Sequence, residues 1–207
     1  SSGSRHSDAI ADLDAILSFA KQPDYRADLQ YRVGQLYATA GNEASAIERW
    51  FLATKESADS QSAYLALVEL INREVPFDPY LRAKIDLQAE AWFPAINAYQ
   101  IFLESVPISD TRHAIALHEL GLSQLGAEDV DAAIATFDRV ITQFPQCTCL
   151  GQTWMDKARA QIIRGDSSGA RRSYRTFARE HPTDPLAPEA LWQSGIRALR
   201  DDNRIEA

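Results

Sequence analysis

An all-α fold built from paired helices is predicted by three features of the sequence. First, a pattern recurs in which an alanine is followed four residues later by an aromatic residue, and eight residues after that by a proline. It is complete in residues 132–145 and 169–182. Second, a copy with the same spacing runs from Ala95 to Pro107, and less complete copies lie further upstream, at intervals of 35 to 49 residues. Third, hydrophobic residues make up 45% and charged residues 24% of the chain, which is ordinary for a globular protein. Together these features indicate helices stacked as repeats.

The recurring pattern has a physical explanation, which residues 132–145 illustrate. Ala133 and Phe137 are four residues apart, so they lie on one face of a helix. The small alanine lets a neighbouring helix approach closely, and the ring fills the groove beside it. Pro145 cannot continue the helix, so the chain turns there.

Each such helix is expected to follow a partner helix in the sequence. Gly34 and Gly121 fall inside apolar stretches with helical spacing. A glycine within a helix costs about 1 kcal/mol relative to alanine, which is tolerable where another helix must come close. Gly41 and Gly165 are expected in the turns that follow, in left-handed conformation. The alanine of the recurring pattern falls in each second helix. These alanines are Ala11, Ala46, Ala95, Ala133 and Ala170, with gaps of 35, 49, 38 and 37 residues.

These positions resemble the tetratricopeptide repeat family, whose helix pairs carry a large residue, Leu-Gly and Tyr, then Ala, an aromatic residue, Ala and Pro. The matching residues are Val33, Gly34, Tyr37, Ala46, Trp50 and Ala53; Leu117, Leu120, Gly121, Ala133, Phe137 and Pro145; Trp154, Ala158, Gly165, Ala170, Tyr174, Phe177 and Pro182; and, more weakly, Ala83, Ala95, Tyr99, Phe102 and Pro107. The resemblance covers nearly the whole chain. It implies a right-handed α-solenoid of about eleven helices.

The expected order of elements follows from the spacing. One superhelical domain over residues 5–207 is predicted, and the opening "SSGS" of residues 1–4 is interpreted as an expression scar. The 49-residue gap between Ala46 and Ala95 leaves room for one extra helix after the first full repeat. The predicted elements are a half repeat 7–23, a repeat 25–57, the extra helix 60–74, repeats 76–108, 111–146 and 149–183, and a partial repeat 185–207.

The two half repeats lack partners, so the chain is expected to be part of a longer protein; frayed natural ends are the alternative. Uncapped repeat ends also allow self-association.

The family resemblance implies a concave groove lined by the first helix of each pair, which binds extended peptides or partner helices. By register, the fifth residues of these helices are Tyr31, Tyr80, His118, Met155 and Trp192, and polar ninth residues are Gln35, Lys84 and Arg159. Aromatic rings beside polar side chains suit a peptide or a glycan strand. The alternative is that the superhelix buries this column against itself.

Several functions are disfavoured by composition and motif. The formal net charge of −8 disfavours nucleic acid as the partner, and no stretch is long and apolar enough to span a membrane. No cofactor or metal motif is present: Cys147 and Cys149 stand one residue apart, and no histidine has ligand spacing. Glu104 and Ser105 end a predicted helix rather than open a catalytic domain. The chain is therefore not expected to be an enzyme.

Two looser resemblances bear on the setting. Residues 63–104 look like the helical region that precedes the catalytic domain of some bacterial lytic transglycosylases, and residues 182–192 look like periplasmic tetratricopeptide proteins of the cell envelope. They imply a protein–protein interaction scaffold in bacterial cell-envelope assembly, in the periplasm or outside the cytoplasmic membrane, with the cytoplasm left open. The alternative is a helical arm that guides peptidoglycan strands to a catalytic domain absent from this chain.

Charge is unevenly distributed along the sequence. Residues 150–182 contain seven basic side chains against three acidic ones, in a chain that is acidic overall. This segment could orient an acidic partner or a membrane surface, or it could be a solvated helix exterior.

Overall fold

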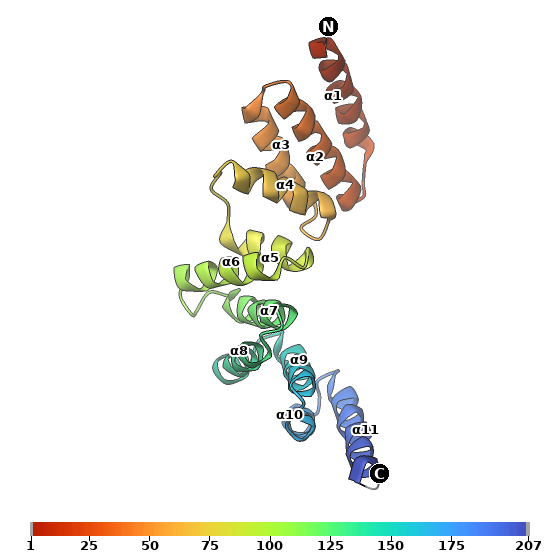
Figure 1. Cartoon of the computed structure of the whole chain (residues 1–207), viewed down its shortest axis with the longest axis vertical. Coiled ribbons are helices and arrows are strands. Elements are labelled where there is room, and N and C mark those ends of the chain that lie inside the picture. The colour runs from red at the N-terminus through yellow and green to blue at the C-terminus, as the bar shows by residue number, and fades with distance from the viewer. Residues whose placement is uncertain (1, 206–207) are drawn as a thin grey trace. The chain divides into compact units, whose positions relative to one another are not determined.

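The computed structural model describes the backbone of residues 2–205 and the side chains of residues 5–200. Within that range the chain forms eleven α-helices and no strand, which confirms the predicted all-α class (Figure 1). Contacts divide it into two compact units, Ser1–Ala98 and Tyr99–Ala207, where the sequence had indicated one domain. The helices are α1 Ser2–Phe19, α2 Pro23–Thr39, α3 Glu43–Glu56, α4 Gln61–Asn72, α5 Pro79–Gln88, α6 Trp92–Ser105, α7 His113–Gly126, α8 Val130–Gln143, α9 Leu150–Ile163, α10 Ser167–Glu180 and α11 Ala187–Ile205.

The two predicted end segments fall partly outside the described residues. Residues 2–4, interpreted from the sequence as part of an expression scar, continue α1, and Ser1 lies outside the described residues. Of the predicted partial repeat, α11 is described as far as Ile205, and residues 206 and 207 are not.

Helix starts are marked by polar caps. Asn42, Ser60 and Asp78 each accept a hydrogen bond from a backbone N–H in the first turn of α3, α4 and α5. In unit 2, Asp129 and Asp166 do the same for α8 and α10, 37 residues apart. A cap of this kind satisfies a backbone donor that the helix leaves unpaired. The second helices α3, α8 and α10 therefore each have their own start signal, and so do α4 and α5.

Helix ends are equally regular. Gly41 and Gly165 have φ values of 79° and 87°, as expected for the turn after a first helix. Glu90 and Glu128 occupy the same left-handed position after α5 and α7, and Glu74 does so after α4. At all five places the left-handed residue donates to a carbonyl three residues back, and the next residue donates five residues back. The extra helix α4 therefore ends as a first helix does.

The glycines inside the first helices admit the rings of the second helices. A Cβ placed on Gly34 would lie 2.6 Å from Nε1 of Trp50, and one on Gly121 would lie 2.5 Å from Cε1 of Phe137. Both distances are too short for any side chain. The close-packing interpretation of the two glycines is confirmed.

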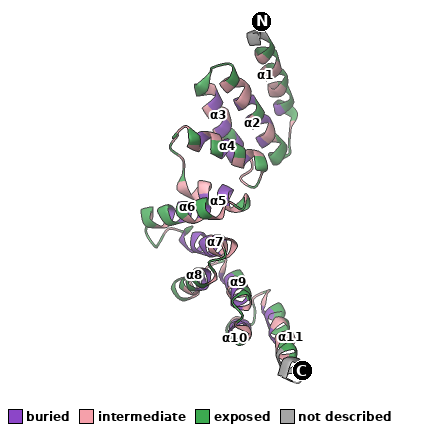
Figure 2. Ribbon diagram, in the orientation of Figure 1, coloured by how far each residue is buried: buried purple, intermediate pink, exposed green. Residues whose placement is uncertain are grey.

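The core of unit 1 is shared by three helices. Trp50 and Ala53 of α3 form one cluster with Ala66 and Leu70 of α4, and Tyr31 of α2 packs against it. The predicted extra helix is thus present and covers the first repeat (Figure 2). Because α4 contacts both α2 and α3, it takes the place that the first helix of a next repeat would occupy.

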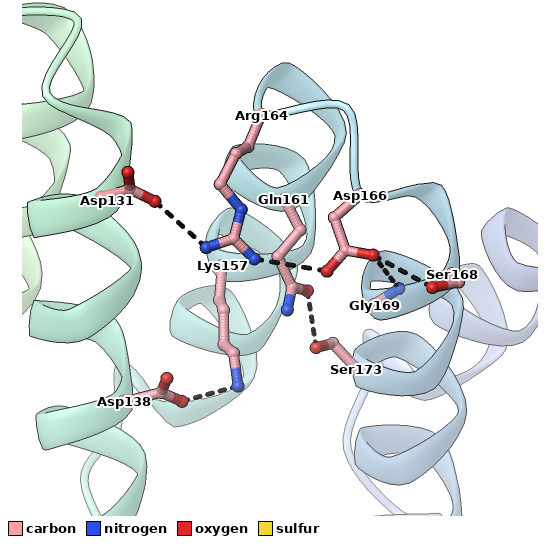
Figure 3. A network of polar contacts seen from close by, with 9 residues as sticks. All are labelled: Asp131, Asp138, Lys157, Gln161, Arg164, Asp166, Ser168, Gly169 and Ser173. Atoms are coloured by element: carbon pink, nitrogen blue, oxygen red, sulfur yellow. Dashed lines mark hydrogen bonds and ion pairs between the residues drawn. The ribbon is translucent and has the colours of Figure 1, made fainter.

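In unit 2 the second-helix rings form the core, and polar contacts bind the helices at its edge. Trp154 of α9 stacks on Phe177 of α10, with ring centroids 6.4 Å apart. Figure 3 shows α9 held between its neighbours: Lys157 pairs with Asp138 of α8 at 2.6 Å, and Gln161 accepts a hydrogen bond from Ser173 of α10 at 2.7 Å.

Candidate binding surface

The eight residues predicted to line a groove fall on first helices of the two units. In unit 1, Tyr31 and Gln35 lie on α2, and Tyr80 and Lys84 lie on α5, all of them half-buried. In unit 2, His118 lies on α7, Met155 and Arg159 on α9, and Trp192 on α11. The structure describes each set within its own unit.

In unit 1 the α2 candidates belong to a chain of polar contacts. Gln35 Nε2 lies 2.8 Å from the Tyr31 hydroxyl and donates to Glu69 Oε1 at 2.7 Å. Glu69 Oε2 in turn accepts from Arg73 Nη1 at 2.6 Å. Glu69 lies in the last turn of α4 and Arg73 is its C-cap, so the extra helix and its end supply the partners of the α2 side chains.

Arg73 links these polar contacts to the core of unit 1. Its guanidinium carbon lies 4.5 Å from the centroid of the Trp50 ring, and its Nε donates to Glu43 of α3. A guanidinium over an indole ring is a favourable cation–π contact. Arg73 is therefore held by two carboxylates and a ring. Sequence reasoning missed Glu69 and Arg73, because only the apolar positions of α4 carried a recognisable signal.

In unit 2, His118 has little surface to offer a partner. It is 8% exposed, its ring lies beside Phe137, and its Nε2 is 3.0 Å from Asp156 Oδ2. Gln152 Nε2 donates to the same carboxylate oxygen at 3.1 Å. This arrangement corresponds to the packing role that the sequence left open.

The other candidates of unit 2 differ in exposure. Met155 is half-buried and packs against the cluster around Trp154 and Tyr174. Arg159 is exposed, and Trp192 is 58% exposed. Trp192 thus presents a large apolar ring with a polar N–H to solvent.

A polar row runs along α11 beside Trp192. Gln193 donates to Glu189 at 2.6 Å and accepts from Arg197, whose guanidinium carbon lies 5.5 Å from the Tyr174 ring centroid. Burial is the main cause that raises the pKa of the Tyr174 hydroxyl; Arg197 and Arg159 oppose it, and Asp156 and Glu189 add to it. Charges from α9 and α11 thus converge over this α10 side chain. We call Met155, Arg159, Glu189, Trp192, Gln193 and Arg197 the α9–α11 surface.

Unit 1 contains a buried acid that the sequence did not reveal. Asp86 of α5 is 4% exposed, and its Oδ2 lies 3.5 Å from Arg82 Nε, too far for a hydrogen bond. Burial is the main cause that raises the pKa of Asp86 to about 6. Both side chains line a cavity of about 170 Å³ together with Tyr64, Leu67, Val68, Ile71, Asn72 and Pro94.

Among the described residues, no three His, Cys, Asp or Glu side chains gather as a metal site. The Sγ atoms of Cys147 and Cys149 are 2.8 Å apart, and burial is the main cause that raises the pKa of Cys149 to about 12. That thiol stays protonated at neutral pH and is a poor nucleophile. Glu104 is exposed at the end of α6. None of the described helices is long and apolar enough to cross a membrane.

One of these helix pairs matches a known protein family. Residues 116–146, which cover most of α7 and all of α8, match the tetratricopeptide repeat family. The match supports a tetratricopeptide-type repeat at this pair. A comparison with curated protein sequences gave no match.

Two solved structures are similar over most of the chain. The TPR2AB domain of yeast Sti1, in its complex with pHSP90, is 18% identical, and the match covers 94% of this chain and 80% of that one, with a TM-score of 0.46. The crystal structure of MamA is 17% identical, with coverage of 96% and 91% and a TM-score of 0.38. At such scores neither structure carries a function across.

Proposed function

We propose that this chain is a non-catalytic protein–protein interaction module that binds a peptide or a partner helix on the α9–α11 surface. The observation that carries the proposal is the exposure of Trp192, at 58%, beside the row of Glu189, Gln193 and Arg197. Exposed rings flanked by ordered donors and acceptors are typical of residues that dominate binding energy.

The contrast with the buried candidates supports this choice. His118 is 8% exposed and Gln35 is tied to Glu69, so their hydrogen-bonding groups are already engaged within the chain. Arg159 and Trp192 have free surface. Arg159 and Trp192, the two exposed candidates, are therefore the side chains to test first.

A peptide-display selection tests the proposal directly. Random peptides are selected on the wild-type chain, and their dissociation constants are then measured with Trp192→Ala and Arg159→Ala. We expect Trp192→Ala to weaken binding by about tenfold or more, because truncating a central ring costs on the order of 2 kcal/mol.

Ile163→Ala is the matched control, because Ile163 is an exposed apolar residue of α9, 56% exposed, outside the α9–α11 surface. It should leave affinity unchanged. Selected peptides that bind Trp192→Ala as tightly as the wild type would show that the surface is wrongly assigned.

The proposed cellular setting and the glycan-guiding alternative rest on the sequence resemblances alone. We infer a place in bacterial cell-envelope assembly, in the periplasm or outside the cytoplasmic membrane, from residues 182–192, and a glycan-guiding arm as its alternative from residues 63–104. Co-sedimentation with purified peptidoglycan separates them. Binding that Trp192→Ala abolishes favours the arm, and no binding favours the protein scaffold.

A further inference from the structure

Three arginines occupy one outward face of α10. Arg172, Arg175 and Arg179 follow the helical spacing i, i+3 and i+7, and all are exposed. With Thr176 and with Leu191 of α11 they line a pocket of about 360 Å³. We call these five residues the basic edge. It lies within unit 2, on a flank of α11 different from the one that carries Trp192 and the polar row.

The positive charge of this edge is not neutralised within the described part of the chain. Arg172 and Arg175 have no carboxylate partner there. Arg179 contacts only its neighbour Glu180, at 3.3 Å, and the Arg179 side chain is 77% exposed. By contrast, Figure 3 shows two paired basic residues: Lys157 of α9 pairs with Asp138, and Arg164, which follows the end of α9, pairs with both Asp131 and Asp166.

The preceding repeat shows that the fold does not need these arginines. The residues of α8 that lie 37 positions earlier share the core alanine and ring, but their outward side chains are Ala135, Asp138, Arg139 and Thr142. Like charges three and four residues apart destabilise a helix by a few tenths of a kcal/mol each. The basic edge thus carries a cost that packing does not explain.

Leu191 adds an apolar element to the same edge. Its equivalent one repeat earlier is Trp154, which is 8% exposed within the core cluster of unit 2. Leu191 is 57% exposed. A helix covers this position in the preceding pair, because Trp154 of α9 stacks on Phe177 of α10. The surface at Leu191 thus has the register of a helix-packing position.

We propose that the basic edge binds an amphipathic helix of a partner protein, with a row of carboxylates facing the three arginines and an apolar side chain covering Leu191. The arginines span about 10 Å along α10, since a helix rises about 1.5 Å per residue. Carboxylates repeated on one face of a partner helix match that spacing, and arginine forms paired hydrogen bonds to a carboxylate. This inference rests on the proposed interaction function but assigns a second surface.

A designed peptide provides the probe. A synthetic helical peptide of about 18 residues carries glutamates at i, i+3 and i+7 with leucines on the adjoining flank, and its fluorescence anisotropy is titrated with the whole chain. We expect binding that weakens by about tenfold or more in the triple variant Arg172→Glu, Arg175→Glu, Arg179→Glu. Leu191→Asp should weaken it as well. Binding should also weaken as salt is raised, because exposed charges are screened.

Two controls keep the test specific. Arg139→Glu changes an exposed arginine on α8 outside the basic edge and should leave the affinity unchanged. Trp192→Ala should also leave it unchanged, which separates this proposal from the α9–α11 surface. Circular dichroism of the triple variant shows whether its helices are retained, and Arg→Lys at the three positions should keep part of the binding.

Three results would overturn the proposal. The first is a peptide with lysines in place of glutamates that binds equally well. The second is a folded triple variant that binds the glutamate peptide as the wild type does. The third is a glutamate peptide that fails to bind the wild type. In that case, weaker binding of the triple variant to vesicles of anionic lipid would assign the edge to a membrane surface. Altered sedimentation of the triple variant would assign it to self-association.

Discussion

The two units treat their first-helix surfaces differently. In unit 1 the predicted groove residues Tyr31 and Gln35 are joined to Glu69 and Arg73 of the extra helix, so their polar groups are engaged. In unit 2 Arg159 and Trp192 remain exposed on the corresponding helices. The interior is alike in both, because a ring of the second helix packs on a glycine of the first. A repeat therefore conserves its core geometry while its surface is free to specialise.

The largest expected effect tests the shared core. Trp50→Ala in unit 1 and Phe137→Ala in unit 2 each remove a ring with 0% exposure, and each should lower the free energy of unfolding by about 3–5 kcal/mol. Urea unfolding followed by circular dichroism measures both. If only one of them is costly, the units do not share one packing principle.

The glycines should give the next largest effect. Gly34→Ala and Gly121→Ala push a methyl group against Trp50 and Phe137, and should cost about 1–3 kcal/mol. Gly195→Ala is the matched control: it lies on α11 with nothing within 4 Å of the added Cβ. That change should instead stabilise the chain by up to about 1 kcal/mol. Equal effects at the three sites would contradict the close approach of ring and glycine.

A pH-dependent effect on stability is expected at Asp86 of unit 1. The pKa of Asp86 is raised from 3.8 to about 6, so the folded chain holds this proton more tightly than the unfolded chain. The resulting stability is present below pH 3.8 and is lost as the pH rises through 6. Asp86→Asn should therefore raise the free energy of unfolding by about 1–2 kcal/mol at pH 8.

Urea unfolding at pH 8 and at pH 4 measures the Asp86 effect, which should largely vanish at the lower pH. The same change at Asp59, an exposed acid outside this cavity, is the control and should have no pH-dependent effect. A stabilisation at pH 8 that persists unchanged at pH 4 would contradict the assignment.

The smallest effects separate the two surfaces. Gln35→Ala removes hydrogen bonds to Tyr31 and Glu69 and should cost about 1 kcal/mol of stability. Trp192→Ala and Arg159→Ala remove exposed side chains and should change stability by less than about 0.5 kcal/mol. Thermal unfolding of the three variants makes the comparison. A loss at Trp192 as large as that at Gln35 would mean that Trp192 serves packing.

The predicted site was only partly readable from the sequence. Register placed the eight candidates on first helices, since helical periodicity is a local property. It did not show that His118 would meet Asp156, 38 residues away, or that Gln35 would meet Glu69, 34 residues away. Such pairs depend on which neighbouring helix reaches across, and exposure depends on the same geometry. The α10 arginines were visible as a basic segment, but their pocket with Leu191 was not.

By itself the sequence determined the helices, their pairing and the contact between a small residue and an aromatic ring. It could do so because the period near 37 residues and the spacing of alanine, ring and proline are local signals that recur in each repeat. Only the tertiary structure decided that α4 packs on α2 and α3 and engages their polar groups, that Asp86 is buried beside Arg82, and that Trp192 and the basic edge stay open. The physical reason is that burial and long-range polar pairing are set by how successive helix pairs stack, which no single repeat encodes.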